Sequence, residues 1–156
     1  YIARYEVSQA RLRRYLDGKI RDAVRYHDAD EAPLALRADV VVVGLLKRGF
    51  IDDSRHAELR THALLERGRS PRDVRHRLRA QGVADSTISA TLAAYRAADG
   101  DRDPAFTAAI AYAKRRGFGP FRDEATRAER RERDLASMVR AGHDYAIARR
   151  VIDEPG

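Results

Sequence analysis

The sequence predicts an all-α protein built from repeated helical units, and three observations support this fold class. Charged residues make up 35% of the 156 residues and aromatic residues only 7%, a composition typical of surface-rich helical proteins rather than sheets. Apolar residues recur with the period of a helix over most of the chain. A pattern of helix, tight turn and capped helix occurs three times, which indicates stacked helical modules.

The repeated unit is anchored by three capping residues, Ser8, Ser70 and Asp144. Each has a side-chain oxygen that can accept a hydrogen bond from the first turn of the helix that follows. Each is followed by apolar residues four and eight positions later, which lie on one face of a helix. Gly68 and Gly142 stand two residues before their caps, where the preceding helix needs a left-handed residue to end.

The remaining helices are predicted from the same periodicity. In chain order they are expected at 39–48, at 55–67, after Gly82 through Tyr95, at 106–116 and at 124–140. The valine run within 39–48 has strand propensity, but Leu45, Leu46 and the Lys47-Arg48-Gly49 ending favour a buried helix. Polar or breaking residues predict loops at 27–33, at 100–104 and at Gly119–Pro120.

Two adjacent carboxylates, Asp52 and Asp53, follow the helix end at Gly49. A catalytic pair should converge on one cleft of low dielectric. Aspartates at a helix start instead accept amide hydrogen bonds and lie at the positive end of the helix dipole. We therefore interpret Asp52 or Asp53 as the cap of the helix at 55–67, with both carboxylates favoured by the positive end of its dipole.

The composition limits the classes of function. The chain has 31 Lys and Arg against 24 Asp and Glu, a net charge of +7, and such a surface attracts nucleic acid or an acidic protein. A GC-rich genome would also enrich arginine, so the charge alone does not decide. The absence of cysteine excludes disulfides and thiolate chemistry, and no apolar run of about 18 residues predicts a membrane span.

No catalytic or metal-binding set is recognisable in the sequence. The five histidines form no pair at helical spacing, and the glycines at 117 and 119 are not followed by the lysine of a phosphate-binding loop. We expect a cytoplasmic monomer that is not an enzyme and needs no cofactor or metal.

Four stretches in order resemble the RecX family of regulatory proteins. They are 1–16, the G-F-I-D-D-S-R-H-A run at 49–57, the R-G-R-S-P run continuing through 67–83, and the combination of 115–120 with 140–152. Together they extend over essentially the whole chain. Three residues depart from the family pattern. His56 replaces the usual aromatic residue, Gln81 replaces a common lysine, and His143 replaces the usual phenylalanine. An insertion occupies 26–36.

The resemblance implies a fold of three tandem three-helix modules in an elongated, curved array. Their expected bounds are 1–50, 51–99 and 104–156. It also implies a modulator of the RecA recombinase that binds the RecA–DNA filament along its groove. Such a protein suppresses ATP hydrolysis, strand exchange and co-protease activity, and so modulates DNA repair and the SOS response. Some family members also bind DNA weakly, so single- or double-stranded DNA is an expected second partner.

The arginines at the edges of the repeat helices and in the turns are the candidate contacts to RecA or DNA. The set is Arg13, Arg67, Arg69, Arg72, Arg75, Arg79, Arg115, Arg116, Arg122 and Arg149. A curved array could present them as one stripe. The alternative is a solvated face with ion pairs within helices, such as Asp73 with Arg77. A second function also remains open, a DNA-binding transcriptional regulator of the helix-turn-helix type, because the units resemble that motif locally.

Overall fold

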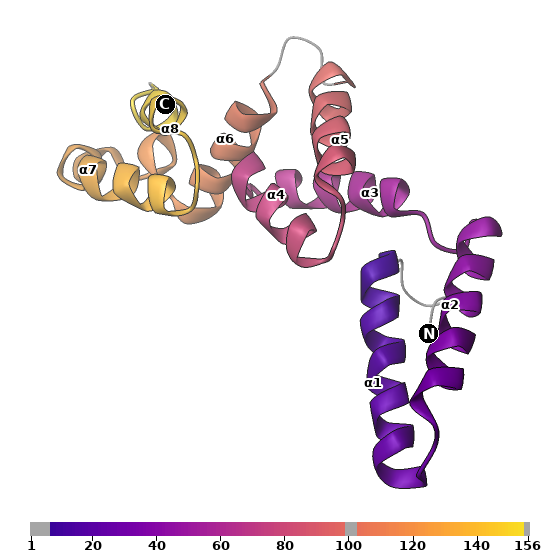
Figure 1. Ribbon diagram of the computed structural model, residues 1–156. Coiled ribbons are helices and arrows are strands. Elements are labelled where there is room, and N and C mark those ends of the chain that lie inside the picture. The colour runs from indigo at the N-terminus through magenta and orange to yellow at the C-terminus, as the bar shows by residue number, and fades with distance from the viewer. Residues whose placement is uncertain (1–6, 99–102, 155–156) are drawn as a thin grey trace.

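The computed structural model describes residues 7–98 and 103–154 (Figure 1). Within these ranges the structure is helical and contains no strand, so the predicted all-α class is confirmed. The helices are α1 (Gln9–His27), α2 (Glu31–Lys47), α3 (Asp53–Glu66), α4 (Pro71–Ala80), α5 (Asp85–Ala98), α6 (Pro104–Arg116), the 3-10 turn η2 (Gly119–Phe121), α7 (Glu124–Arg140) and α8 (Tyr145–Ile152). The helix predicted before Ser8 lies outside the described residues.

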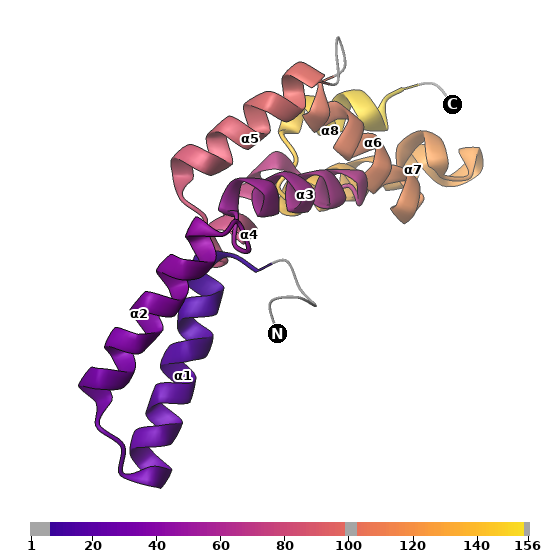
Figure 2. The same ribbon diagram turned by 90° about the vertical axis from the view of Figure 1, so that its right-hand side faces the viewer.

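The molecule is elongated (Figures 1 and 2). The hairpin of α1 and α2 projects at one end, α3 to α5 lie in the middle, and α7 and α8 lie at the other end. Each region has its own small core. Leu12, Val42 and Ile51 form the first, Val74, Leu78 and Ile88 belong to the second, and Leu135, Met138, Val151 and their neighbours form the third. Helix α6 contributes to the second and third cores and therefore joins them.

The three predicted caps are confirmed. The Ser8 hydroxyl accepts from the Arg11 amide, the Ser70 hydroxyl from the Asp73 amide, and the Asp144 carboxylate from the amides of α8. Gly68 and Gly142 have φ of 71° and 90°, the left-handed conformation expected of them. Local sequence signals thus fix where these helices begin and end.

The start of α2 differs most from the prediction, whereas α3 and α6 each begin two residues earlier than expected. Helix α2 begins at Glu31 rather than at Asp39, so the predicted loop at 27–33 shrinks to three residues. The Asp30 carboxylate caps α2 by accepting from the Ala32 amide at 3.2 Å. Pro33 is tolerated because it falls in the first turn, where a backbone N–H has no partner within the helix.

The turns between helices form two similar joints between the regions. The Ser8 hydroxyl donates to the Gln81 carbonyl at 2.6 Å, and the Ser70 hydroxyl donates to the Ala141 carbonyl at 3.4 Å. In each joint the cap serine of one helix meets the turn at the end of another, and both serines are buried. In the second joint, Gly142 of the turn lies close to the cap serine, because a Cβ on Gly142 would lie 2.8 Å from the Ser70 Oγ.

Candidate partner-binding surface

Five of the ten candidate arginines form ion pairs with acidic side chains of the chain itself. Arg13 pairs with Asp17 and Asp39, Arg69 with Asp73, Arg79 with Asp85, Arg122 with Asp134 and Arg149 with Asp153. Most of these pairs are exposed to solvent. An exposed pair contributes little to stability, so its arginine can be redirected to a partner.

Arg122 differs from the other paired arginines. Its guanidinium binds the Asp134 carboxylate through two hydrogen bonds of 2.9 Å, and Asp134 is 2% exposed. This hydrogen-bonded contact raises the pKa of Arg122. Removing one partner would leave a charge buried without compensation. The structure therefore gives Arg122 an internal partner that holds η2 against α7.

Arg67, Arg115 and Arg116 lie where the turn after α3 meets the end of α6. The Arg115 guanidinium donates to the Arg67 carbonyl at 2.6 Å. The guanidinium carbons of Arg115 and Arg116 lie 5.7 and 5.8 Å from the centre of the Tyr112 ring, within cation–π range. The structure thus brings Arg67 next to Arg115 and Arg116, which lie 48 and more positions away in sequence.

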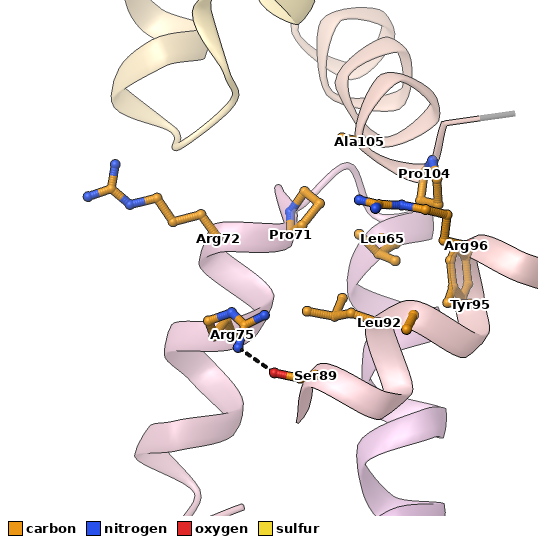
Figure 3. A pocket seen from close by; sticks show the side chains of 11 residues that line it. Leu65, Pro71, Arg72, Arg75, Ser89, Leu92, Tyr95, Arg96, Pro104 and Ala105 are labelled. Carbon is orange, nitrogen blue, oxygen red and sulfur yellow. Dashed lines mark hydrogen bonds between the residues drawn. The ribbon is translucent and has the colours of Figure 1, made fainter. Parts of the chain in front are cut away.

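The remaining two candidates, Arg72 and Arg75, line a pocket between α3, α4, α5 and the start of α6 (Figure 3). Its volume is about 350 Å³. Leu65, Pro71 and Leu92 form an apolar floor, and the guanidinium groups of Arg75 and Arg96 lie on either side of it, while that of Arg72 points away. The Arg75 guanidinium donates to the Ser89 hydroxyl at 3.0 Å.

Comparison with known proteins identifies the family of this chain. The chain is 30% identical over 154 residues to the regulatory protein RecX of Myxococcus xanthus (strain DK1622), covering 98% of this chain and 80% of that protein. The chain belongs to the RecX family. It is also 25% identical over 140 residues to the regulatory protein RecX of Agrobacterium fabrum (strain C58 / ATCC 33970), covering 86% of this chain and 72% of that relative. No family model and no solved structure matched.

Membership of the RecX family supports a regulatory role. Within residues 7–98 and 103–154, no group of three histidine, cysteine or acidic side chains could hold a metal ion. None of the described helices is long and apolar enough to cross a bilayer.

Arg96 was missed in the sequence analysis of this RecX-family chain. Ser89, Leu92 and Arg96 follow one face of α5, a pattern that was visible in the sequence. What the pattern could not show is that this face meets Arg75 of α4 and Pro104 of α6. That arrangement depends on tertiary packing.

A second basic surface follows α7. Thr126, Arg130, Arg133 and Ser137 line one hollow with Phe118, and Arg116, Arg140 and Tyr112 line a second one that shares Phe118 and Ser137. Their volumes are about 420 and 410 Å³. Arg130, Arg133 and Arg140 recur every three or seven residues and so share one side of α7. We name Arg130, Arg133 and Arg140 the α7 stripe; sequence analysis did not select these residues.

Proposed function

We propose that this protein binds the RecA–DNA filament and inhibits the ATPase, strand-exchange and co-protease activities of RecA, and so modulates DNA repair and the SOS response. The observation that carries the proposal is the match to a regulatory protein RecX over 98% of the chain. Inhibition would arise from binding and occlusion, with no chemical step. The protein would act in the cytoplasm as a monomer.

The proposed array has modules at 1–50, 51–99 and 104–156, and two features support it. Each region has its own core, with α6 connecting the second core to the third, and the joints at Ser8 and Ser70 repeat the same contact. An elongated chain of modules suits a partner that extends over many subunits, because each module can contact a different one.

The proposed contact surface centres on the middle module. Arg72 and Arg75 form no ion pair among the described residues, and Arg67, Arg69, Arg79, Arg115 and Arg116 lie on the same or adjoining elements. Arg13 and Arg149 would extend the surface onto the outer modules. Arg122 is left out of it because Asp134 already occupies its guanidinium.

The test is the DNA-dependent ATPase activity of the cognate RecA on single-stranded DNA, with this protein added well below one per RecA protomer. We expect strong inhibition at levels too low to sequester the DNA, which binding to DNA alone would check. The variant R72E/R75E/R96E should inhibit much less. The variant R21E/R37E/R60E changes three exposed arginines away from the pocket and keeps the same net charge, so it serves as the matched control.

A second candidate function is DNA binding by a helix-turn-helix-like transcriptional regulator, and the α7 stripe favours it. Its arginines offer phosphate contacts, and the half-buried Phe118 beside them offers a ring surface. A sequence-specific regulator should bind its operator about 10³-fold or more tightly than random DNA. Selection from a random duplex library that enriches no sequence would exclude this candidate while leaving the filament proposal intact.

A further inference from the structure

The pocket between α3, α4, α5 and α6 combines an apolar floor with two cationic sides. Leu65 of the floor is 3% exposed, while Pro71 and Leu92 are half-buried, so the floor continues the folded core. Arg75 comes from α4 and Arg96 from α5, and their guanidinium groups approach from opposite sides (Figure 3). Among the residues that the structure describes, none of those lining the pocket is acidic.

Neither Arg75 nor Arg96 forms an ion pair with an acidic side chain of the described residues, although the pKa of Asp85 is lowered by its hydrogen bond with Arg79 and also by the charge of Arg75. Asp73 and Asp85 are the acidic residues of α4 and of the first turn of α5. Asp73 pairs with Arg69 and Arg77, and Asp85 with Arg79. Asp103 precedes the pocket residues Pro104 and Ala105, but its carboxylate caps α6 by accepting from the Ala105 amide at 3.0 Å. Within the described residues, the Arg75 guanidinium donates to the neutral Ser89 hydroxyl rather than to a carboxylate.

We propose that this pocket binds a short acidic segment of a partner protein, with a carboxylate held between Arg75 and Arg96 and a neighbouring apolar side chain on Leu65 and Leu92. The proposal rests on the filament-binding function and names the kind of RecA-side segment that the middle module would capture. Guanidinium groups suit this ligand because each can donate two parallel hydrogen bonds to a carboxylate. The volume of about 350 Å³ accommodates one or two side chains.

Charge complementarity would also allow a nucleic-acid phosphate, but the shape of the pocket favours a peptide. A nucleic-acid backbone requires cations spaced along a groove, whereas here two cations enclose one recess. Bases stack on flat rings, whereas the floor consists of leucine and proline. The one aromatic residue of the lining, Tyr95, already packs edge to face with His62, with ring centres 5.7 Å apart.

The test uses two synthetic peptides with blocked ends, Glu-Phe-Glu and its uncharged counterpart Gln-Phe-Gln, titrated into the ¹⁵N-labelled protein. We expect the acidic peptide to shift the amide signals of Ser89, Leu92, Ala93 and Arg96, and the uncharged peptide to bind about tenfold or more weakly. The variant R75E/R96E should lose the effect. Because Ala93 lines the pocket and is exposed, A93W should fill the pocket and block the peptide while keeping both charges.

Several outcomes would overturn the proposal. These are equal shifts from both peptides, shifts that survive in R75E/R96E and in A93W, or no localised shift in the wild-type protein. A twelve-nucleotide oligothymidine that shifts the same four amides more strongly than the acidic peptide would assign the pocket to nucleic acid instead.

The RecA ATPase assay, run with the same proteins, separates this inference from the proposed function. Inhibition that persists in R75E/R96E and in A93W overturns the role of the pocket and leaves the filament function standing. A wild-type protein that binds Glu-Phe-Glu at the pocket but does not inhibit RecA overturns the filament function and supports the ligand class.

Discussion

The His56 ring and the Gln81 side chain form a hydrogen bond, with 2.8 Å between Nε2 and Oε1. Both residues depart from the RecX-family pattern, which has an aromatic residue and a lysine at these positions. The contact joins α3 to the end of α4, next to the Ser8 hydroxyl that donates to the Gln81 carbonyl. The two departures therefore lie in contact and act as a matched pair at the first joint.

We predict that H56F and Q81K are coupled in stability. Each single change removes one partner and leaves the other without its hydrogen bond, whereas the double variant restores the family combination. The coupling free energy should be about 1 kcal/mol in favour of the double variant, as expected for residues in direct contact. Urea unfolding of the four proteins measures it, and free energies that add to within about 0.3 kcal/mol would show that the pair is independent.

Asp52 and Asp53 provide a second prediction, because they cap two different helices. The Asp52 carboxylate accepts from the Ser54 and Arg55 amides at the start of α3, whereas that of Asp53 accepts from the Gln9 amide of α1 at 2.8 Å. Each change to alanine should cost about 1 kcal/mol. Hydrogen exchange should accelerate at Ser54 and Arg55 in D52A and at Gln9 in D53A.

The control for this pair is D22A, which changes an exposed aspartate on α1 that caps no helix. It should leave exchange at all three amides unchanged. Faster exchange at Gln9 in D52A, with no effect in D53A, would contradict the assignment of separate caps.

These caps also show what the sequence could and could not predict. Ser8, Ser70 and Asp144 were predicted correctly, and Asp52 was one of two candidates, because a cap needs only a side chain and the amides of the next turn. That Asp53 reaches a different helix could not be predicted, since Gln9 lies 44 positions away in sequence. The position of Arg75 and Arg96 on two sides of one pocket could not be predicted for the same reason.

The predicted stripe of ten arginines illustrates the limit at the candidate site. The sequence correctly predicted an ion pair within a helix, since Asp73 does pair with Arg77 at 3.0 Å. It could not separate Arg122, which is committed to the buried Asp134, from Arg72, which is exposed and has no acidic partner in the described structure. That distinction depends on burial, and burial is decided by how helices pack.

Gly68 and Gly44 are predicted to respond oppositely to replacement by alanine. Gly68 has a φ of 71°, and a Cβ there would lie 2.5 Å from the Tyr112 amide nitrogen, so α6 would have to move. G68A should lose at least about 2 kcal/mol. Gly44 lies inside α2 with open space around it, so G44A should gain about 0.5–1 kcal/mol. Thermal unfolding measures both, and a G68A variant as stable as G44A would show that the α3–α4 turn does not pack on α6.

His143 makes the second joint sensitive to pH. It is 4% exposed and its ring centre lies 5.1 Å from that of Tyr112. Burial lowers the pKa of His143, while a hydrogen bond to the Gly68 backbone opposes the shift. The folded protein therefore favours the neutral ring, and the unfolded chain takes up the proton first. The stability that this provides is complete above the unfolded pKa of about 6.5 and is lost as the pH falls.

We predict that H143F reduces the pH dependence of unfolding between about pH 5 and 7. The wild-type slope from this one group can reach at most about 1.4 kcal/mol per pH unit. Phenylalanine cannot take up a proton and keeps the ring contact with Tyr112. H76Q, at an exposed position of α4, is the control and should retain the wild-type slope. Identical slopes for H143F and the wild-type protein would show that His143 does not contribute.

The α7 stripe is predicted to determine how weak DNA binding depends on salt. Arg130, Arg133 and Arg140 lie on one side of α7, and Arg140 also donates to the Ser137 hydroxyl at 3.1 Å. For single strands, each phosphate contact contributes about 0.7 to the slope of the logarithm of the binding constant against the logarithm of the salt concentration. R130Q/R133Q/R140Q should therefore lower that slope by about 2, measured by fluorescence anisotropy with an oligothymidine.

R75Q/R96Q, which alters the pocket instead, should leave the slope near its wild-type value. A slope lowered equally by both variants would show that DNA contact is spread over the whole basic surface, whereas a slope lowered only by R75Q/R96Q would move the nucleic-acid site to the pocket.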